Sequence, residues 1–357
     1  MNFSEHFAKQ SFRYQEKDKN WIYSPYSISM AMGMSYLGAV NKTQMEIEAV
    51  FQFLEDKLPS VLPEAAQETI LIGNGIFISD VFSLRNDFAT MVKAQLQANA
   101  QLIRMKDTKS ASAVINRWIA NRTQEGIQEL VKPEDIDPDF TRLILVNVLY
   151  FMGQWKTPFE KERTKEEVFY KNGAKEQKIK MMTRTLPLAV HQSEASLLVA
   201  LPYRDDVTFF IILPREKDGW KTMTPENWEQ HFDFLQSAET RKTKISLPQF
   251  SLTSTADFSE LLKKMGIVTA FSDIDADFSK IAAERLKIDK VLHQSNISID
   301  ENGTEASAAT TVLISHPRSA GFVSEPLLEV KIDHPFFFVL RHNQTKDWLF
   351  IGQYLGE

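Results

Sequence analysis

A run of small residues near the C-terminus constrains the fold more than any other feature of this sequence. After Gly303 the chain carries no bulky side chain until Leu313. A helix built from this run would lack an apolar face, and a loop this long and apolar would be unusual in a compact domain. In a strand, one face would carry only small or aliphatic residues: Thr304, Ala306, Ala308, Thr310, Val312 and Ile314. The opposite face would carry Glu305, Ser307, Ala309, Thr311 and Ser315. An exposed, flexible linker is the alternative interpretation.

The composition is that of an ordinary globular chain. Its 357 residues are 43% hydrophobic and 25% charged, which excludes a mostly disordered protein. The net charge is −6, whereas nucleic-acid binders normally carry a basic excess, so we expect no DNA or RNA partner. There is no Cys, which excludes disulfides and thiolate zinc sites. The apolar stretches are too short for a spanning helix, so we expect no membrane partner.

Hydrophobic periodicity predicts helices in the first part of the chain and strands mostly later. We expect helices over 2–17, 25–37 (capped by Ser24), 43–53, 86–99, 110–131 and 257–265. We expect strands over 69–79, 143–151, 197–201, 207–213, 244–247, 287–293, 329–332, 336–341 and 349–353. This order favours an α+β fold in one domain, 1–357. Gly73-Asn74-Gly75 interrupts the first of these strands and predicts a β-bulge rather than a phosphate loop.

Motifs of catalysis are missing from the sequence. It contains no G-x-S-x-G, no G-x-x-x-x-G-K and no H-E-x-x-H. The seven histidines are scattered, and none forms a metal-type pair at helical spacing. We therefore expect no metal, no cofactor and no enzyme activity.

Several motifs, in a fixed order, carry a resemblance that spans nearly the whole chain. Residues 20–39 include Ser24-Pro25-Tyr26-Ser27-Ile28, and residues 147–159 begin Asn-Val-Leu-Tyr-Phe. The later motifs are Leu247-Pro248-Gln249-Phe250, Met265-Gly266-Ile267, Ala276-Asp277-Phe278-Ser279, the stretch 301–310, Asp333-His334-Pro335-Phe336 and Leu349-Phe350-Ile351-Gly352. In these motifs the chain resembles the serpins, a family of serine protease inhibitors.

The resemblance implies a fold and a mechanism. The fold is a single domain with helices around a large central mixed β-sheet and an exposed reactive-centre loop, here about 303–327. The protease cleaves this loop and stays esterified to it, and the loop then inserts into the sheet as an extra strand. The hinge of that loop would be Glu301, Gly303, Thr304, Glu305, Ala306, Ser307, Ala308, Ala309 and Thr310. Small residues at the inserting positions favour an inhibitor over a non-inhibitory binding or carrier protein.

The resemblance also assigns polar residues that control the opening of the sheet. Ser24, Ser27, Asn147 and His293 match a cluster, the shutter, whose hydrogen bonds hold two strands together. Trp155 and Gln249 match positions at the top of the sheet, the breach; taken alone, Trp155 would be interpreted as a core residue. The family often has Lys where this chain has Gln249. We therefore expect at best a hydrogen bond to Glu301, and a sheet that opens more easily.

The position of the reactive bond is less defined. Family spacing from Gly303 places it between Pro317 and Arg318, but proline fits a protease pocket poorly. One step on, Arg318-Ser319 suits trypsin-like enzymes, whose pocket carries an acid for Arg, and the preceding His316-Pro317 makes the site thrombin-like. We therefore predict cleavage between Arg318 and Ser319. The fallback sites are Pro317, His316, Leu313 and Phe322.

Three expectations concern partners and location. We expect a monomer whose partner is a target serine protease, bound covalently. Heparin activation is not expected, because the family's basic helix would correspond to 54–68, and this stretch is acidic here. The absence of an apolar signal core and of Cys, with a glycosylation sequon at Asn302 in the hinge, favours a cytoplasmic or nucleocytoplasmic protein. A secreted mature chain is the alternative.

Overall fold

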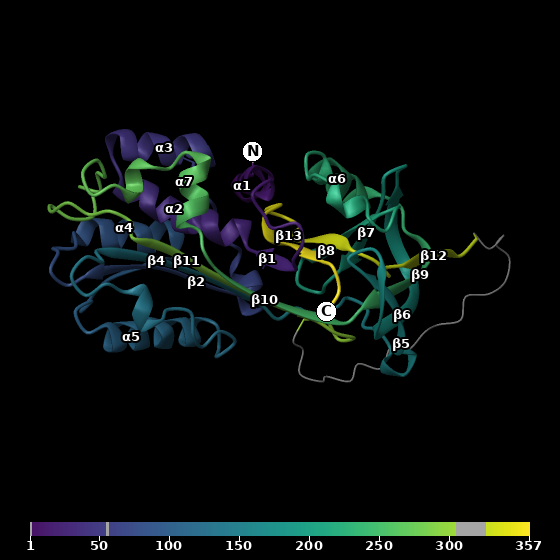
Figure 1. The fold of residues 1–357 in the computed structure, drawn as a ribbon. Helices are drawn as coiled ribbons and strands as arrows, with labels where there is room; N and C mark the ends of the chain where they lie inside the picture. The colour runs from purple at the N-terminus through teal and green to yellow at the C-terminus, as the bar shows by residue number, and fades with distance from the viewer. Residues whose placement is uncertain (1, 55–56, 305–325) are drawn as a thin grey trace.

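The computed structural model describes residues 2–54, 57–304 and 326–357, which form two β-sheets and seven α-helices (Figure 1). The first sheet, called the central sheet here, has the order β10–β11–β4–β2–β3. Its strands are β10 (Phe250–Asp257), β11 (Lys290–Ile299), β4 (Leu143–Phe151), β2 (Ile70–Ser79) and β3 (Asn99–Ile103). The α+β class expected from the sequence is confirmed.

The second sheet has nine strands in the order β1–β14–β13–β8–β7–β6–β9–β12, with β5 paired to β6. These strands are β1 (Trp21–Tyr23), β5 (Lys165–Lys171), β6 (Lys175–Gln192), β7 (Ser196–Pro202), β8 (Val207–Pro214), β9 (Arg241–Pro248), β12 (Leu328–Lys331), β13 (Phe336–His342) and β14 (Trp348–Tyr354). Strands β13, β14 and β8 are buried along their whole length, which explains their continuous apolar sequences.

Most of the helices lie on the two faces of the central sheet. They are α1 (Phe3–Phe12), α2 (Pro25–Gly38), α3 (Asn41–Phe51), α4 (Asn86–Leu96), α5 (Thr108–Arg122), α6 (Trp228–Ser237) and α7 (Ser259–Met265). Figure 1 shows α2, α3, α4 and α7 on one side of the central sheet and α5 on the other. None of the helices in the described part of the chain is long and apolar enough to cross a membrane.

Local sequence explains where α2 begins. The hydroxyl of Ser24 accepts a hydrogen bond from the Ser27 N–H at 3.0 Å, and Pro25 follows at the first helical position. Both are standard helix-start features. The helix is buried almost all round, because it lies between the central sheet and the other helices. Ser24 and Ser27 are thereby held beneath the sheet.

Several predicted boundaries are wrong. The helix predicted over 86–99 ends at Leu96, and the strand predicted over 287–293 is Lys290–Ile299. Helix α1 ends at Phe12 rather than at residue 17. Helix α3 begins at Asn41, so Thr43 is not its cap; instead the Thr43 hydroxyl accepts a hydrogen bond from the Asp277 N–H at 3.0 Å. Helix α5 ends at Arg122, and the Thr123 hydroxyl accepts from the Ile127 N–H at 3.0 Å. This side-chain bond closes a turn in place of a further helical turn.

The predicted bulge at Gly73-Asn74-Gly75 is also wrong. Strand β2 pairs with β4 in unbroken register through all three residues. A side chain at either glycine would collide with neighbours: a Cβ at Gly73 would lie 2.8 Å from Val148, and one at Gly75 would lie 3.0 Å from Trp118. Glycine is thus required because Trp118 of α5 packs directly on the strand.

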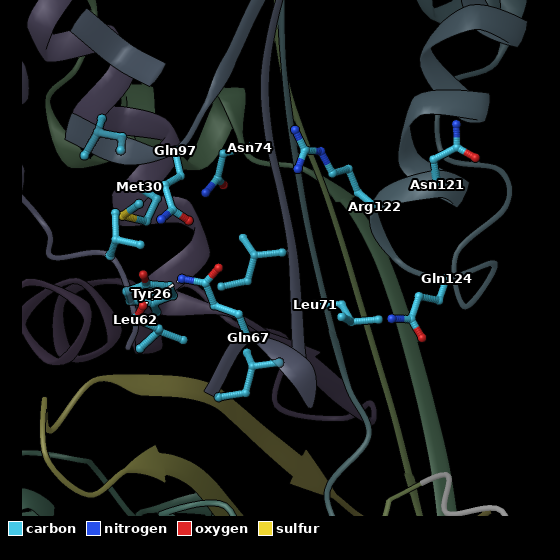
Figure 2. A pocket seen from close by; sticks show the side chains of 14 residues that line it. Tyr26, Met30, Leu62, Gln67, Leu71, Asn74, Gln97, Asn121, Arg122 and Gln124 are labelled. Carbon is cyan, nitrogen blue, oxygen red and sulfur yellow. Dashed lines mark hydrogen bonds between the residues drawn. The ribbon is translucent and has the colours of Figure 1, made fainter. Parts of the chain in front are cut away.

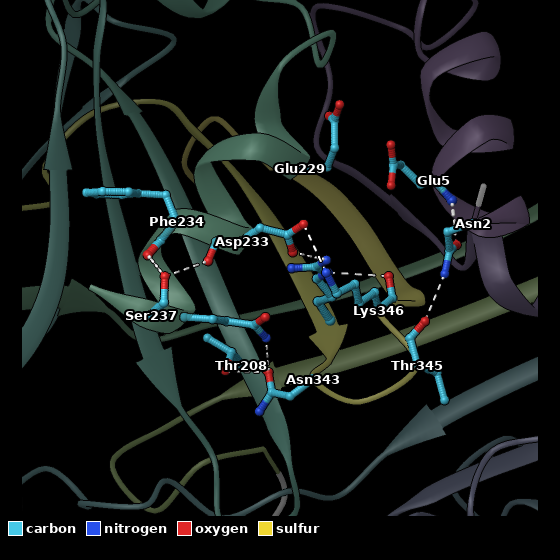
Figure 3. A network of polar contacts seen from close by, with 12 residues as sticks. Asn2, Glu5, Thr208, Glu229, Asp233, Phe234, Ser237, Asn343, Thr345 and Lys346 are labelled. Carbon is cyan, nitrogen blue, oxygen red and sulfur yellow. Dashed lines mark hydrogen bonds and ion pairs between the residues drawn. The ribbon is translucent and has the colours of Figure 1, made fainter. Parts of the chain in front are cut away.

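A polar network joins the ends of the chain to the second sheet (Figure 3). Asp233 of α6 accepts from Arg341 at 2.6 Å and from Lys346 at 3.0 Å. Arg341 is only 1% exposed, so this pairing offsets the cost of burying its charge. The Asn2 amide donates to the Thr345 carbonyl at 3.2 Å. The hairpin between β13 and β14 is therefore anchored to both α6 and the start of α1.

Candidate functional site

Strands β4 and β11 lie side by side and form the seam of the central sheet. They pair in parallel from Ile144 with Lys290 to Tyr150 with Asn296, and no described strand lies between them. Beyond Tyr150 the two strands part. The top of the seam is where an additional strand would enter.

The hinge begins in a tight turn at that point. The Asp300 carboxylate accepts from the N–H groups of Asn302 at 2.7 Å and Gly303 at 3.0 Å, and the Asp300 N–H donates to the Gly303 carbonyl at 2.9 Å. Gly303 has φ +146°, and a side chain there would collide with the Gly153 carbonyl. The turn therefore requires glycine.

Thr304 is already inside the sheet. It bridges Ile299 of β11 in antiparallel orientation, and its N–H donates to the Gly153 carbonyl at 2.7 Å. Its hydroxyl lies 2.8 Å from the Tyr203 hydroxyl, and the residue is fully buried. The chain thus enters the top of the seam with its direction reversed, as the first residue of a new strand would.

The remaining hinge residues lie outside the described residues: Glu305, Ala306, Ser307, Ala308, Ala309 and Thr310. The same holds for the predicted reactive bond at Arg318 and Ser319 and for the fallback sites Pro317, His316, Leu313 and Phe322. Their roles stay predictions.

Trp155 and Glu301 hold the turn in place. Trp155 is fully buried, stacks on Tyr203 with ring centroids 4.1 Å apart, and donates its indole N–H to the Asp300 carbonyl at 2.8 Å. The Glu301 carboxylate accepts from the Gln249 amide and from the Thr164 hydroxyl, both at 2.6 Å. Among the described residues Glu301 makes no ion pair. The neutral donors Gln249 and Thr164 therefore bind Glu301 here, in place of the Lys–Glu ion pair that a lysine at position 249 would make.

The four predicted shutter residues lie together across the middle of the seam. His293 and Asn147 are directly opposite each other in the β11–β4 register. The imidazole Nδ1 lies 2.7 Å from the Asn147 side-chain oxygen, and Nε2 accepts from the Ser24 N–H at 3.0 Å. Since Nε2 accepts, the proton sits on Nδ1 and is donated to Asn147. The Asn147 amide in turn donates to the Ser27 carbonyl at 2.6 Å. Together these residues are called the shutter cluster below.

Sequence reasoning missed three members of the site. Asn74 accepts from the Asn147 amide at 2.5 Å, the Ser295 hydroxyl lies 2.7 Å from His293 Nε2, and Tyr203 contacts Thr304. Ser295 could have been found by alternation, because it lies two residues after His293 on the same strand and therefore on the same face. Asn74 could not, because its place beside Asn147 depends on the register of β2 against β4. Nothing in the local sequence marks Tyr203.

Comparison with known proteins decides the family. The model of the family described as serpin (serine protease inhibitor) matches residues 1–356. The chain belongs to the serpin family. Serpins are in general inhibitors of serine proteases rather than enzymes, which agrees with the lack of catalytic motifs noted above. The resemblance predicted from the motifs is confirmed.

Named serpins resemble the chain over most of its length. It is 30% identical to glia-derived nexin of Mus musculus and 33% identical to Iripin-8 of Ixodes ricinus. Each match covers 94% of this chain and 87% of the relative. A crystal structure of native protease nexin-1 with heparin has a TM-score of 0.86 and 26% identity, covering 100% of this chain and 98% of that one.

A cavity of about 270 Å³ reaches the shutter cluster through Asn74. Figure 2 shows Asn74 among its lining residues, with Met30 and Gln97 nearby and Arg122 opposite, at the end of α5. Asn74 is 7% exposed. The hydrogen-bond network across the seam therefore has one side chain that borders a space accessible to water.

The buried histidine predicts a pH dependence. Burial lowers the pKa of His293 to about 3, whereas an unfolded histidine titrates near its ordinary value of about 6.5. Between these values the unfolded chain binds a proton that the native protein does not, so stability falls as the pH falls. We expect a contribution of about 1.4 kcal/mol per pH unit below about pH 6.

Denaturant midpoints from neutral pH to about pH 4 measure this slope. His293→Gln should flatten it, because the variant has no imidazole to protonate at this position. A slope equally steep in His293→Gln would assign the acid sensitivity to other groups.

Proposed function

We propose that this serpin is a monomeric suicide-substrate inhibitor of trypsin-like serine proteases that acts by inserting its cleaved loop between β4 and β11. The observation that carries the proposal is the position of Thr304, buried at the open top of the seam and bridged to Ile299 in the direction that an inserted strand would follow. The small residues that come next would thread easily into the sheet. A non-inhibitory serpin that binds or carries a ligand is the alternative.

The chemistry takes place on the protease. Its catalytic serine attacks the carbonyl carbon of Arg318, the Arg318–Ser319 bond breaks, and the new amino group of Ser319 leaves with the proton supplied by the protease histidine. An ester then joins the protease to Arg318. Insertion of the loop carries this ester away before water hydrolyses it. The inhibitor contributes a conformational change, the insertion of its loop, and no catalytic residue.

Arg318→Ala tests the target class. We expect the variant to lose its SDS-stable complex with trypsin, because the acid in the protease pocket has no partner without the arginine. Arg318→Lys is the matched control and should still form the complex, since trypsin-like pockets accept either base. Complex formation at the same rate in Arg318→Ala would place the reactive bond at another residue of the loop.

Heparin plays no part in the proposal. Residues 54–68 hold four acidic residues and one lysine, and their described part contains only a 3₁₀ helix, Glu64–Glu68. An acidic segment without an extended basic face does not attract a polyanion. We expect the rate of trypsin inhibition to stay unchanged when heparin is added, as measured by residual protease activity over time. A large acceleration would reveal a basic surface elsewhere on the molecule.

We also propose a cytoplasmic or nucleocytoplasmic location, on the strength of Asn302. This residue is a sequon asparagine in the hinge turn, where its carbonyl accepts from the Trp155 N–H at 2.9 Å. A glycan there would be bulky and polar at the point of insertion, so an inhibitor made in the secretory pathway would be impaired. The mass of the Asn302 peptide from native protein tests this: glycan mass would contradict the proposal.

A further inference from the structure

A second cavity, of about 400 Å³, lies between α1, β1 and residues 220–226. Aromatic side chains form its walls: Phe12, Trp21, Trp220 and Phe337. Met223 and Pro225 complete the lining on the side of residues 220–226. It shares no residue with the hinge or the shutter cluster, so whatever it binds is additional to protease inhibition.

The aromatic wall is rigid. The Phe12 ring lies 5.4 Å from the Phe337 ring and meets Trp21 edge-on at 5.9 Å. Trp21, Trp220 and Phe337 are each at most 8% exposed, so their positions are fixed by the core behind them. A preformed apolar wall of this kind binds a flat or compact apolar body without a cost for reordering side chains.

The rim of the cavity is basic. Lys9 is already neutralised, with Glu5 and Glu229 each 2.8 Å away. Arg13 and Lys17 are exposed and make no ion pair among the described residues. The Lys17 ammonium reaches the Lys221 carbonyl at 3.2 Å, which joins the two sides of the cavity.

One acidic residue, Glu226, also lines the cavity, and it is exposed. The uncompensated charge at the rim is therefore two cations against one anion. The positive end is formed by Arg13 and Lys17, which belong to the segment just after α1, while Glu226 belongs to the opposite side. Both cations line the cavity from this one segment, so a carboxylate on this side of the cavity would face Arg13 and Lys17 rather than Glu226.

We propose that this cavity binds a small amphipathic anion: a compact aromatic body against the tryptophan and phenylalanine wall, with one carboxylate at Arg13 and Lys17. The volume lies near the lower end of the range for ligand pockets, about 300–1,000 Å³, and so suits one small molecule rather than a peptide. Apolar walls with a few polar groups at one end are the usual design of such sites.

Isothermal titration calorimetry with three matched probes tests the proposal: naphthalene-2-carboxylate, the neutral naphthalene-2-methanol and the cationic 2-naphthylmethylamine. We expect one carboxylate per chain, with the alcohol weaker and the amine weakest. In Arg13→Gln/Lys17→Gln the carboxylate should lose affinity by about tenfold, as expected for two partly solvated ion pairs, and the alcohol should be unchanged. The control Lys93→Gln/Lys106→Gln makes the same change in net charge on α4 and after β3, and should leave both affinities unaltered.

A filling variant separates this cavity from other sites. Met223→Trp should abolish binding of the carboxylate and of the alcohol without lowering the melting temperature, because Met223 is only half-buried at the cavity wall. The proposal is overturned if the carboxylate shows no saturable binding, if the amine binds as tightly, if the remote double variant loses as much affinity as Arg13→Gln/Lys17→Gln, or if binding survives Met223→Trp.

Discussion

Replacing Thr304 with arginine is expected to turn the protein from an inhibitor of trypsin into its substrate. Thr304 is fully buried between Gly153 and Tyr203, and an unpaired charge at that depth costs several kcal/mol. Since Thr304 is already buried in the intact protein, arginine would be displaced from the top of the seam, and insertion after cleavage would have to bury it again. Water would then hydrolyse the ester before the protease is displaced. Since about 1.4 kcal/mol on a barrier is a factor of ten in rate, the number of inhibitor molecules consumed per protease should rise about tenfold or more.

The matched control is Thr304→Val, which keeps the size of the side chain and loses only the contact with Tyr203. It should still form an SDS-stable complex with trypsin. The measurement is the stoichiometry of inhibition, with the cleaved and complexed forms separated on a gel. If Thr304→Arg inhibits with the stoichiometry of the unaltered protein, insertion at this hinge is not the mechanism.

Cleavage of the reactive loop, without any substitution, is expected to raise the thermal midpoint by tens of degrees. Insertion would break the direct pairing of β4 with β11, but the new strand would pair with both. The sheet would gain about ten or more backbone hydrogen bonds net, each contributing about 1 kcal/mol. In a domain of this size each kcal/mol moves the midpoint by about 1 to 2 °C. The intact protein would thus be held in its native form kinetically, with a more stable state available after cleavage.

A metalloprotease that forms no ester is suitable for preparing the cleaved form, and mass spectrometry identifies the cut. Circular dichroism then compares the melting of intact and cleaved protein. Cleaved Thr304→Arg is the internal control. Its thermal midpoint should rise far less, because its loop cannot enter the sheet as a strand. Equal midpoints for intact and cleaved protein would indicate a serpin that does not insert its loop, as in the carrier alternative.

How much of the fold was predictable depended on burial. Strand β4, predicted as 143–151, is observed as Leu143–Phe151, because a strand covered on both faces is continuously apolar. Strands β5 and β6 were missed, since they are rich in Lys and Glu and mostly half-buried or exposed. Helix α6 was missed for a related reason: half of its residues are exposed, and only Trp228, Phe232 and Leu235 are buried.

Site residues could be predicted where the resemblance to the family assigned them. They could not be predicted where their place depends on which residues of two strands lie opposite each other. Ser24 and Asn147 belong to two of the motifs, and His293 was assigned from its match to the family's shutter. The parallel pairing of β4 with β11 places Asn147 and His293 opposite each other. Asn74 joins them only because β2 pairs with β4 without a bulge, against the prediction. Tyr203 reaches Thr304 from the second sheet, and no periodicity within one segment reports a contact between two sheets.

For Gln249 the sequence predicted the type of contact: a hydrogen bond to Glu301 instead of an ion pair. The expected hydrogen bond to Glu301 is present at 2.6 Å, and Thr164 supplies a second neutral donor. A hydrogen bond to a carboxylate from a neutral donor is weaker than one from a cation. The top of the seam, where Thr304 enters, is therefore held by neutral contacts and by the stacking of Trp155 on Tyr203.

The central claim is that cleavage of the loop traps the protease, and one experiment tests it most directly. The intact protein is mixed with an equimolar amount of trypsin, denatured in SDS and analysed by gel and by mass spectrometry. We expect a covalent complex of the two chains and a released peptide that runs from Ser319 to Glu357. Complete cleavage at Arg318 with free, active trypsin and no complex would contradict it.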